Sequence, residues 1–213
     1  MEAIAVLGAL MGLAFVSGLR LYSTILAIGL GIRFGYLIIP PNLTQLHILA
    51  QTPILAVAGV VYTVEFFADK IPWVDTVWDA VHTFVRPIGA AVLAATAVGN
   101  VDPIVKLGAV LLCGGIALSS HSAKAGTRIL ANHSPEPFSN IGLSLAEDAI
   151  VAGGVWLALK HPLVSLLLVT VAVGFTLWLI PKLIRLFRRQ ATRIRDFARA
   201  RFARASAPPA ARS

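Results

Sequence analysis

The stretch PWVDTVWDAVHTFVRP, residues 72–87, combines a row of charged and polar side chains with bulky apolar ones. The row consists of Asp75, Asp79, His82 and Arg86, which are spaced four, three and four residues apart. On an α-helix this spacing places all four side chains within an arc of about 60°. The stretch therefore predicts an amphipathic helix with one narrow charged stripe.

The chain around this stretch is too apolar for a soluble domain. Of its 213 residues, 57% are hydrophobic and 13% are charged, and the mean hydropathy is +0.81. Soluble domains carry about 25% charged residues. Apolar runs of the length that crosses ~30 Å of hydrocarbon recur along the chain, so the composition predicts a polytopic membrane protein.

Six apolar segments can be distinguished, at about residues 3–32, 53–67, 88–98, 104–119, 141–159 and 163–187. The first would be about 45 Å long as one helix and contains Arg20, so we expect a helix break near residues 18–23. The third is too short alone and should include the turn before Pro87, with the preceding stretch lying at the membrane interface. The sequence thus predicts an all-α, polytopic transmembrane helix bundle of about six spans, with a broken first helix and an interfacial amphipathic helix.

The net positive charge of the chain, +8, comes from its C-terminal end. From Lys182 to Arg212 there are ten Lys or Arg residues and one acid, Asp196. Because this run directly follows an apolar segment, it predicts a cytoplasmic tail facing anionic lipids, in preference to a nucleic-acid-binding arm. We divide the chain into a transmembrane helical domain, residues 1–187, and a basic, disordered tail, residues 188–213. Glu2 replaces the basic cluster of a signal peptide, so the first segment should remain in the mature protein.

Two polar connecting segments, residues 68–87 and 120–140, should lie on the same side of the membrane as the tail. They contain Lys70, Arg86, Lys124 and Arg128, whereas the connections on the other side carry few basic residues. With six crossings, the positive-inside rule predicts that both termini and both segments face the cytoplasm.

The second segment carries charge complementary to the first. His121, Lys124 and Arg128 share a helical arc of about 60°, opposite in sign to the acids of residues 65–79. Charged groups at the edge of a bilayer core pair or line a cavity, so we expect the two faces to meet. The candidate polar centre comprises Arg20, Glu65, Asp69, Asp75, Asp79, His82, Arg86, His121, Lys124, Arg128, Glu136, Glu147 and Asp148.

Several interpretations of these residues stay open. Asp75, Asp79 and His82 could present three metal ligands, but Arg86 on the same stripe would repel a cation. The stripe could also be the solvated face of an interfacial helix, or part of a site for an anion or a lipid headgroup. The basic face could hold a phosphate or another anion, or pair with the acids; Arg20 could pair with Glu147 or Asp148, or line a polar pathway.

An enzyme is not the expected function. The chain has no P-loop or Rossmann glycine pattern and no glycine-flanked serine elbow. Its single cysteine, Cys113, lies in an apolar run, which excludes an intrachain disulfide and a cysteine-based metal site. We predict no catalytic residue, no cofactor and no bound metal.

Three blocks of the sequence resemble domain-of-unknown-function family 4126, a group of small bacterial multi-pass membrane proteins. The blocks are SGLRLYSTILAIGL, VEFFADKIPWVDTVWDAVHTFVRPIGAA and SHSAKAGTRILANHSPEPFSNIGLSLAEDAIV, and the resemblance extends over about residues 10–181. It implies an integral protein of the bacterial inner membrane, and it assigns no activity and no catalytic residue.

Two hypotheses for the function follow. The first is a small transporter or channel-like protein whose polar centre passes an anionic solute or a lipid headgroup. Proline-bounded apolar segments at residues 53–72 and 162–181 agree with the repeated halves of many transporters. The second is a non-catalytic membrane scaffold or assembly factor that contacts the lipid bilayer, or a homo-oligomeric partner. A cavity at the polar centre would favour transport, and a closed ion-pair cluster would favour the scaffold.

Overall fold

The computed structural model describes residues 2–132, 137–179, 181–182 and 185, and all of its described elements are helical. They are α1 (Glu2–Leu19), α2 (Leu21–Arg33), the 3-10 helix η1 (Pro41–Ala50), α3 (Thr52–Ala68), α4 (Pro72–Val98), α5 (Pro103–Asn132), α6 (Pro137–Lys160) and the helix Pro162–Leu179. This confirms the all-α fold. The chain divides into two compact units, Met1–Gly174 and Phe175–Ser213, and the arrangement below is that of the first. The proposed tail, residues 188–213, lies outside the described residues.

Five helices are long and apolar enough to cross a membrane: α1, α4, α5, α6 and Pro162–Leu179. The helices η1 and α3 together form a sixth candidate, which is bent by 69° at their junction. Large apolar side chains such as Trp73, Phe84 and Leu111 are exposed on the outer faces, as expected where lipid replaces water. The described chain is therefore a membrane helix bundle with five or six candidate spans.

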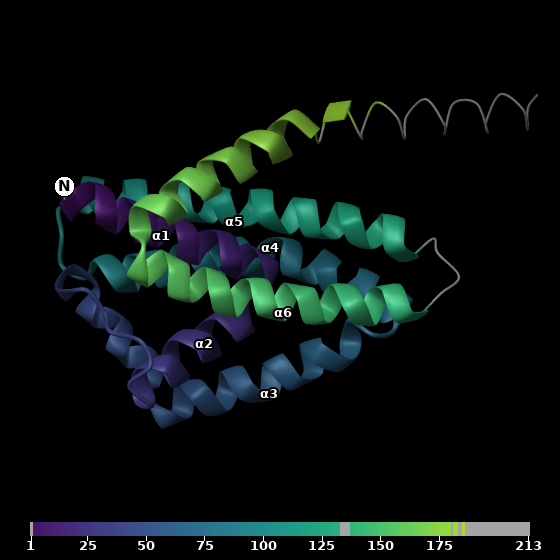
Figure 1. Ribbon diagram of the computed structural model, residues 1–213, viewed down its shortest axis with the longest axis horizontal. Helices are drawn as coiled ribbons and strands as arrows, with labels where there is room; N and C mark the ends of the chain where they lie inside the picture. The colour runs from purple at the N-terminus through teal and green to yellow at the C-terminus, as the bar shows by residue number, and fades with distance from the viewer. Residues whose placement is uncertain (1, 133–136, 180, 183–184, 186–213) are drawn as a thin grey trace, which may run out of the picture. The chain divides into compact units, whose positions relative to one another are not determined.

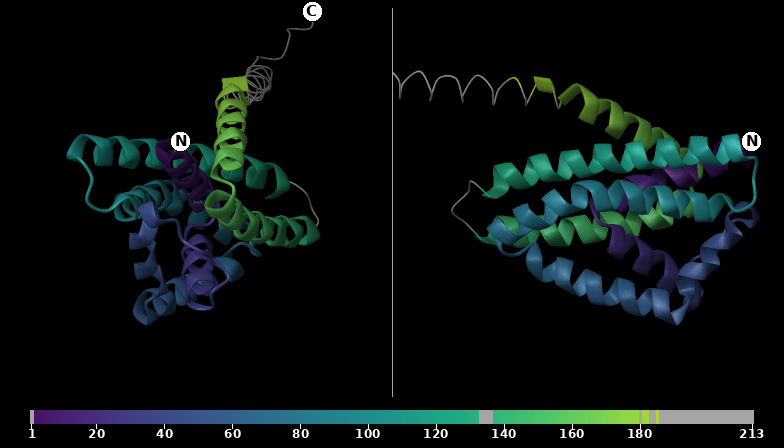
Figure 2. Two further views of the ribbon diagram at one scale, coloured as in Figure 1. Left: turned by 60° about the vertical axis from the view of Figure 1, so that its left-hand side comes forward. Right: turned by 180° about the vertical axis from the view of Figure 1, so that it is seen from behind.

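The expected break in the first segment lies at Arg20, whose backbone is extended between α1 and α2. From this residue α2 runs back toward the end from which α1 comes, as the views in Figures 1 and 2 show. The carbonyl of Arg20 accepts hydrogen bonds from the backbone N–H and the hydroxyl of Thr24, at 3.0 and 2.8 Å. Interrupted helices are tolerated inside a membrane where the freed backbone groups find partners in this way.

The stretch of residues 72–87 is not a separate interfacial helix, which corrects the sequence-based expectation. It forms the first half of α4, which continues through Pro87 to Val98. The physical reason is that its charged stripe faces protein instead of water: Asp75 and Arg86 are fully buried, and Asp79 and His82 are almost so. The stripe is covered mainly by α5, against which α4 packs along its length.

The N-terminal end of α1 lies beside the start of the last helix. Glu2, His161 and Pro162 line one cavity of about 500 Å³. The backbone of Pro162 lies so close to Gly8 that a Cβ there would collide with it. At its other end α1 reaches α5, where Gly18 allows the same close approach to Ala117. The helix thus runs from the Pro162 end of the bundle to the break at Arg20.

Candidate functional site

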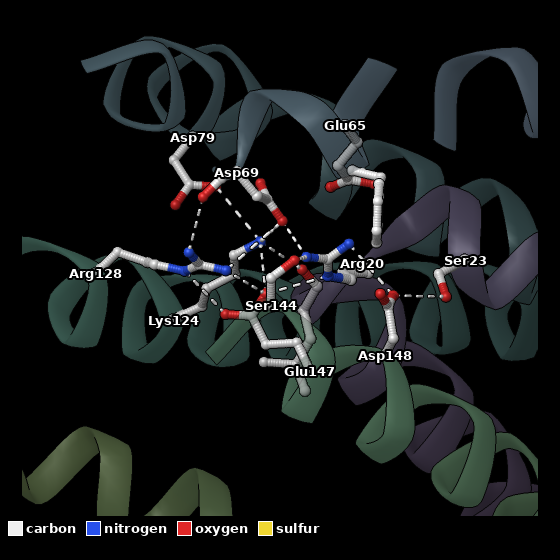
Figure 3. Close-up of polar contacts among 12 residues, drawn as sticks. Arg20, Ser23, Glu65, Asp69, Asp79, Lys124, Arg128, Ser144, Glu147 and Asp148 are labelled. Carbon is white, nitrogen blue, oxygen red and sulfur yellow. Dashed lines mark hydrogen bonds and ion pairs between the residues drawn. The ribbon is translucent and has the colours of Figure 1, made fainter. Parts of the chain in front are cut away.

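A buried ion-pair network lies where the α1–α2 break meets α3, α4, α5 and α6. Figure 3 shows cationic side chains in a row between acids of α3 and α4 on one side and acids of α6 on the other. Asp75 is included because it interacts electrostatically with Arg128. The network consists of Arg20, Glu65, Asp69, Asp75, Asp79, Arg86, Lys124, Arg128, Glu147 and Asp148.

Arg20 is placed at the centre of the network by the break in the helix. Its guanidinium pairs with Asp69 at the end of α3, and its Nε lies 3.1 Å from Glu147 Oε2 on α6. Its Nη1 lies 3.3 Å from Asp148 Oδ1, and its Nη2 donates to Ser144 Oγ at 2.7 Å. One side chain therefore connects the broken first segment to two other helices.

Two cations of α5 complete this part of the network. Lys124 Nζ lies 3.2 Å from Glu147 Oε2, and Arg128 binds both oxygens of Glu147 at 3.0 and 3.1 Å. Such two-pronged contacts are the strongest geometry for an arginine and a carboxylate. Arg128 Nη2 also lies 3.6 Å from Asp69 Oδ2. We call Arg20, Lys124, Arg128, Asp69, Asp75, Glu147 and Asp148 the Arg20 layer.

The remaining members surround Arg86 and form the Arg86 layer, which consists of Arg86, Glu65 and Asp79. The two Nη atoms of Arg86 donate to Glu65 Oε1 at 2.7 Å and to Asp79 Oδ1 at 2.9 Å. Nη1 also lies 2.6 Å from Nδ1 of His121. Lys124 Nζ, 3.8 Å from Asp79 Oδ1, connects the two layers.

Burial disfavours the ionised form of a carboxyl group, and the nearby cations favour it. For Asp69, which follows the last residue of α3, burial raises the pKa of the carboxyl, while Lys124 and Arg20 act in the other direction. Asp148 is the most exposed network acid with an ion pair, with 20% of its side chain accessible. It accepts hydrogen bonds from Tyr62 at 3.1 Å and from Ser23 at 3.4 Å.

The structure brings together every predicted site residue that it describes, and Glu136 lies outside the described residues. The expected meeting of the α4 stripe with the basic face of α5 is confirmed by the contacts of Arg86 with His121 and of Lys124 with Asp79. His82 is buried beside the network but has no ion pair among the described residues; its Nδ1 lies 2.8 Å from the carbonyl of Trp78. In the described part of the chain, no cluster of His, Cys, Asp and Glu has the arrangement of a metal site.

Sequence reasoning missed Tyr62. It precedes Glu65 and Asp69 by three and seven residues, so the three share one face of α3 and its continuation. The same spacing argument that we applied to α4 and α5 would have identified it.

The network is closed in this conformation. Five cavities of about 90 to 620 Å³ open on the described surface, and none of these five is lined by a network residue. Most of their lining side chains are apolar. The charged groups thus pair with one another, and none of these five cavities leads to them.

Two comparisons with known proteins, one with curated sequences and one with solved structures, return no match. A third comparison, with protein families, gives a match over residues 7–182 to the family described as a domain of unknown function (DUF4126). This range includes every member of the ion-pair network. The chain therefore belongs to the DUF4126 family.

Proposed function

We propose that this membrane protein is a small proton-linked carrier for an anionic solute or an anionic lipid headgroup. The observation that carries the proposal is the convergence of three buried cations, Arg20, Lys124 and Arg128, at the break between α1 and α2. Broken helices that meet buried charges near the middle of a membrane are typical of transporter binding sites. Ionisable residues in such positions are functional by default, because apolar residues would stabilise the bundle at lower cost.

The anion would bind by exchange with the protein's own carboxylates. Arg20, Lys124 and Arg128 pair with Asp69 and Glu147 in the closed network. If these acids take up protons, the cations lose their partners and can bind an external anion. An incoming anion and an incoming proton therefore support each other, and the closed network is the substrate-free form of the carrier.

The second candidate is a non-catalytic scaffold in the bacterial inner membrane. It is supported by the closed network and by the absence of network residues from the lining of the five cavities. In that case the ion pairs would only fix the helices in register. Under either function, the basic tail would contact anionic lipids. A second copy of the chain is a candidate partner in both cases.

Flux through liposomes tests the proposal. Purified protein is reconstituted into vesicles that contain a pH-sensitive dye, with the membrane potential clamped, and inorganic phosphate is added outside. We expect the vesicle interior to become acidic faster than in protein-free vesicles. Arg20→Gln should abolish the difference, and Lys160→Gln, a change at an exposed residue that ends α6 and has no ion pair with the network, should retain it.

A second set of vesicles separates the two anion sources. It carries a fluorescent phosphatidylglycerol whose exchange between leaflets is followed with an impermeant quencher. Exchange without phosphate flux assigns the site to the headgroup, and phosphate flux without exchange assigns it to the free anion. If neither rate exceeds that of protein-free vesicles, the carrier proposal is wrong.

A further inference from the structure

The carboxylate of Glu147 is enclosed by three cations that belong to other parts of the bundle. Arg128 of α5 binds both of its oxygens, with Nε 3.1 Å from Oε1 and Nη2 3.0 Å from Oε2. Arg20 Nε, at the α1–α2 break, and Lys124 Nζ of α5 lie 3.1 and 3.2 Å from Oε2. Figure 3 shows the Glu147 side chain extending from α6 to this row of cations. We call the space that its carboxylate occupies the Glu147 cage.

The three cations approach Glu147 more closely than they approach Asp69, the other acid near all of them. Asp69 pairs with Arg20, but it lies 3.6 Å from Arg128 Nη2 and 4.0 Å from Lys124 Nζ. The attraction between charges rises as their separation falls and is strong where water is excluded. The Glu147 cage is therefore the position in the Arg20 layer where the three cations together stabilise a negative charge best.

Arg20 has partners that hold it in place without Glu147. Its guanidinium pairs with Asp69, and its Nη1 lies 3.3 Å from Asp148 Oδ1. Its Nη2 donates to Ser144 Oγ at 2.7 Å. These contacts fix the orientation of the guanidinium, so its Nε points into the Glu147 cage whether or not the carboxylate is there.

The two cations of α5 also have partners besides Glu147. Arg128 Nη1 donates to the backbone carbonyl of Asp69 at 3.3 Å, and Lys124 Nζ donates to that of Leu19 at 3.3 Å. Both side chains are at most 2% exposed. A site whose groups are already held in position loses little conformational freedom when a ligand binds. The Glu147 cage is thus preorganised for an anion.

The present occupant indicates which kind of anion fits. A carboxylate carries one charge and presents two oxygens to the paired nitrogens of Arg128, and a phosphodiester has the same charge and two free oxygens. A singly charged anion replaces the charge of Glu147 one for one. A doubly charged anion would add negative charge to the Arg20 layer, where four acids already face three cations. The layer therefore favours a singly charged ligand.

We propose that the Glu147 cage is the substrate site of the carrier, a role that rests on the proposed function, and that its ligand is a singly charged oxyanion with two free oxygens. In the closed network the carboxylate of Glu147 occupies the place of this ligand. The cations belong to α5 and the α1–α2 break, and the carboxylate belongs to α6, so its side chain can leave while the cations stay. A free carboxylate and the phosphodiester of a lipid headgroup are the two sources of such an anion.

Chemical rescue in detergent tests the proposal without any flux measurement. Glu147→Ala removes the occupant, and formate, a carboxylate small enough to replace it, is added while the melting temperature is followed. At about ten times the dissociation constant of formate, the melting temperature should rise by about 3–6 °C above its value in chloride of equal ionic strength. Hypophosphite, which has one charge and two free oxygens on phosphorus, is the matched probe for a phosphodiester. Sulfate, a dianion, should give a smaller rise.

Two control variants show whether the effect comes from the empty cage. Glu147→Gln fills the cage with a neutral group, so formate should not raise its melting temperature above that in chloride. Glu2→Ala, a change at an exposed residue of α1 outside the network, should also give equal values in the two salts. If Glu147→Ala is too unstable to purify, Lys124→Gln is added to it. This double variant loses one acid and one cation together and keeps Arg128, so formate should still stabilise it.

The outcomes separate the cage from the carrier. Equal melting temperatures in formate, hypophosphite and chloride, or an equal rise in Glu147→Gln, overturn the proposal, and a rise in sulfate as large as that in formate overturns its choice of a singly charged ligand. A rise in formate alone assigns the site to carboxylates, and a rise in hypophosphite assigns it to phosphodiesters as well. Rescue without flux in liposomes would refute the carrier and leave an anion-binding cage. Flux without rescue would refute the cage alone.

Discussion

Glu147 is the acid on which the Arg20 layer depends most. Arg20, Lys124 and Arg128 all contact it, so removing its charge takes away the one acid that these three buried cations share at 3.0 to 3.2 Å. We expect Glu147→Gln to lower the free energy of unfolding by about 3–5 kcal/mol, the range for breaking a buried pair. Thermal and denaturant unfolding in detergent would measure the change.

The matched double variant shows whether the loss comes from charge. Adding Arg128→Gln to Glu147→Gln removes the opposite charge too, and we expect part of the stability to return, with a coupling above about 1 kcal/mol. The pair Asp79→Asn and Lys124→Gln, which joins atoms 3.8 Å apart, should couple less strongly. Additive effects in the first cycle would mean that the Arg128–Glu147 contact contributes no stability.

The element that depends most on close packing is α1, because it carries Arg20 into the bundle. A Cβ at Gly18 would collide with the backbone of Ala117 on α5. We therefore expect Gly18→Ala to lower the stability by about 1–3 kcal/mol, the usual cost of overpacking. Its effect should appear as a lower melting temperature in detergent.

Gly59→Ala is the matched control on α3, since nothing lies within 4 Å of the Cβ it would add. Alanine is a better helix former than glycine, so this variant should be neutral or stabilised by up to about 1 kcal/mol. Equal effects of the two substitutions would show that the α1–α5 approach is looser than the structure indicates.

Helical periodicity made much of the site predictable. The spacing of Asp75, Asp79, His82 and Arg86 projects them onto one face, and the opposite charge on α5 indicates a partner. The sequence could not show which atoms pair, because Arg86 binds Glu65 from an element that no local pattern connects to it. The sequence also could not show the direction of α2. After a helix break, the direction of the next helix is set by its tertiary contacts, which the periodicity of the sequence does not reveal.

At the scale of the whole molecule, the cavity shared by Glu2 and Pro162 bears on topology. The last helix, Pro162–Leu179, begins at the end where α1 begins, and it is long enough to cross the membrane. We therefore expect the two termini on opposite sides, in place of the six crossings with both ends cytoplasmic that charge counting predicted. With a cytoplasmic basic tail, the N-terminus would face outward.

Tags at the two ends would measure this in intact cells. A tag before Met1 should be reached by an impermeant reagent, and a tag after Ser213 should be reached only after lysis. Protection of both tags would restore the original topology. The reverse pattern would invert the bundle and place the ion-pair network toward the outer face.

The position of Arg20 also bears on how the protein is made. Its partners Asp69 and Glu147 lie 49 and 127 residues further along the chain. At a synthesis rate of about 5–20 residues per second, the ribosome needs on the order of 6–25 s to produce the second of them. Until Asp69 is made, on the order of 2–10 s after Arg20 at this rate, the guanidinium has neither of these acids to bind, so the insertion machinery must shelter it or leave it outside the lipid. The first helical hairpin to be translated thus completes its ion pairs only after α6 has been made.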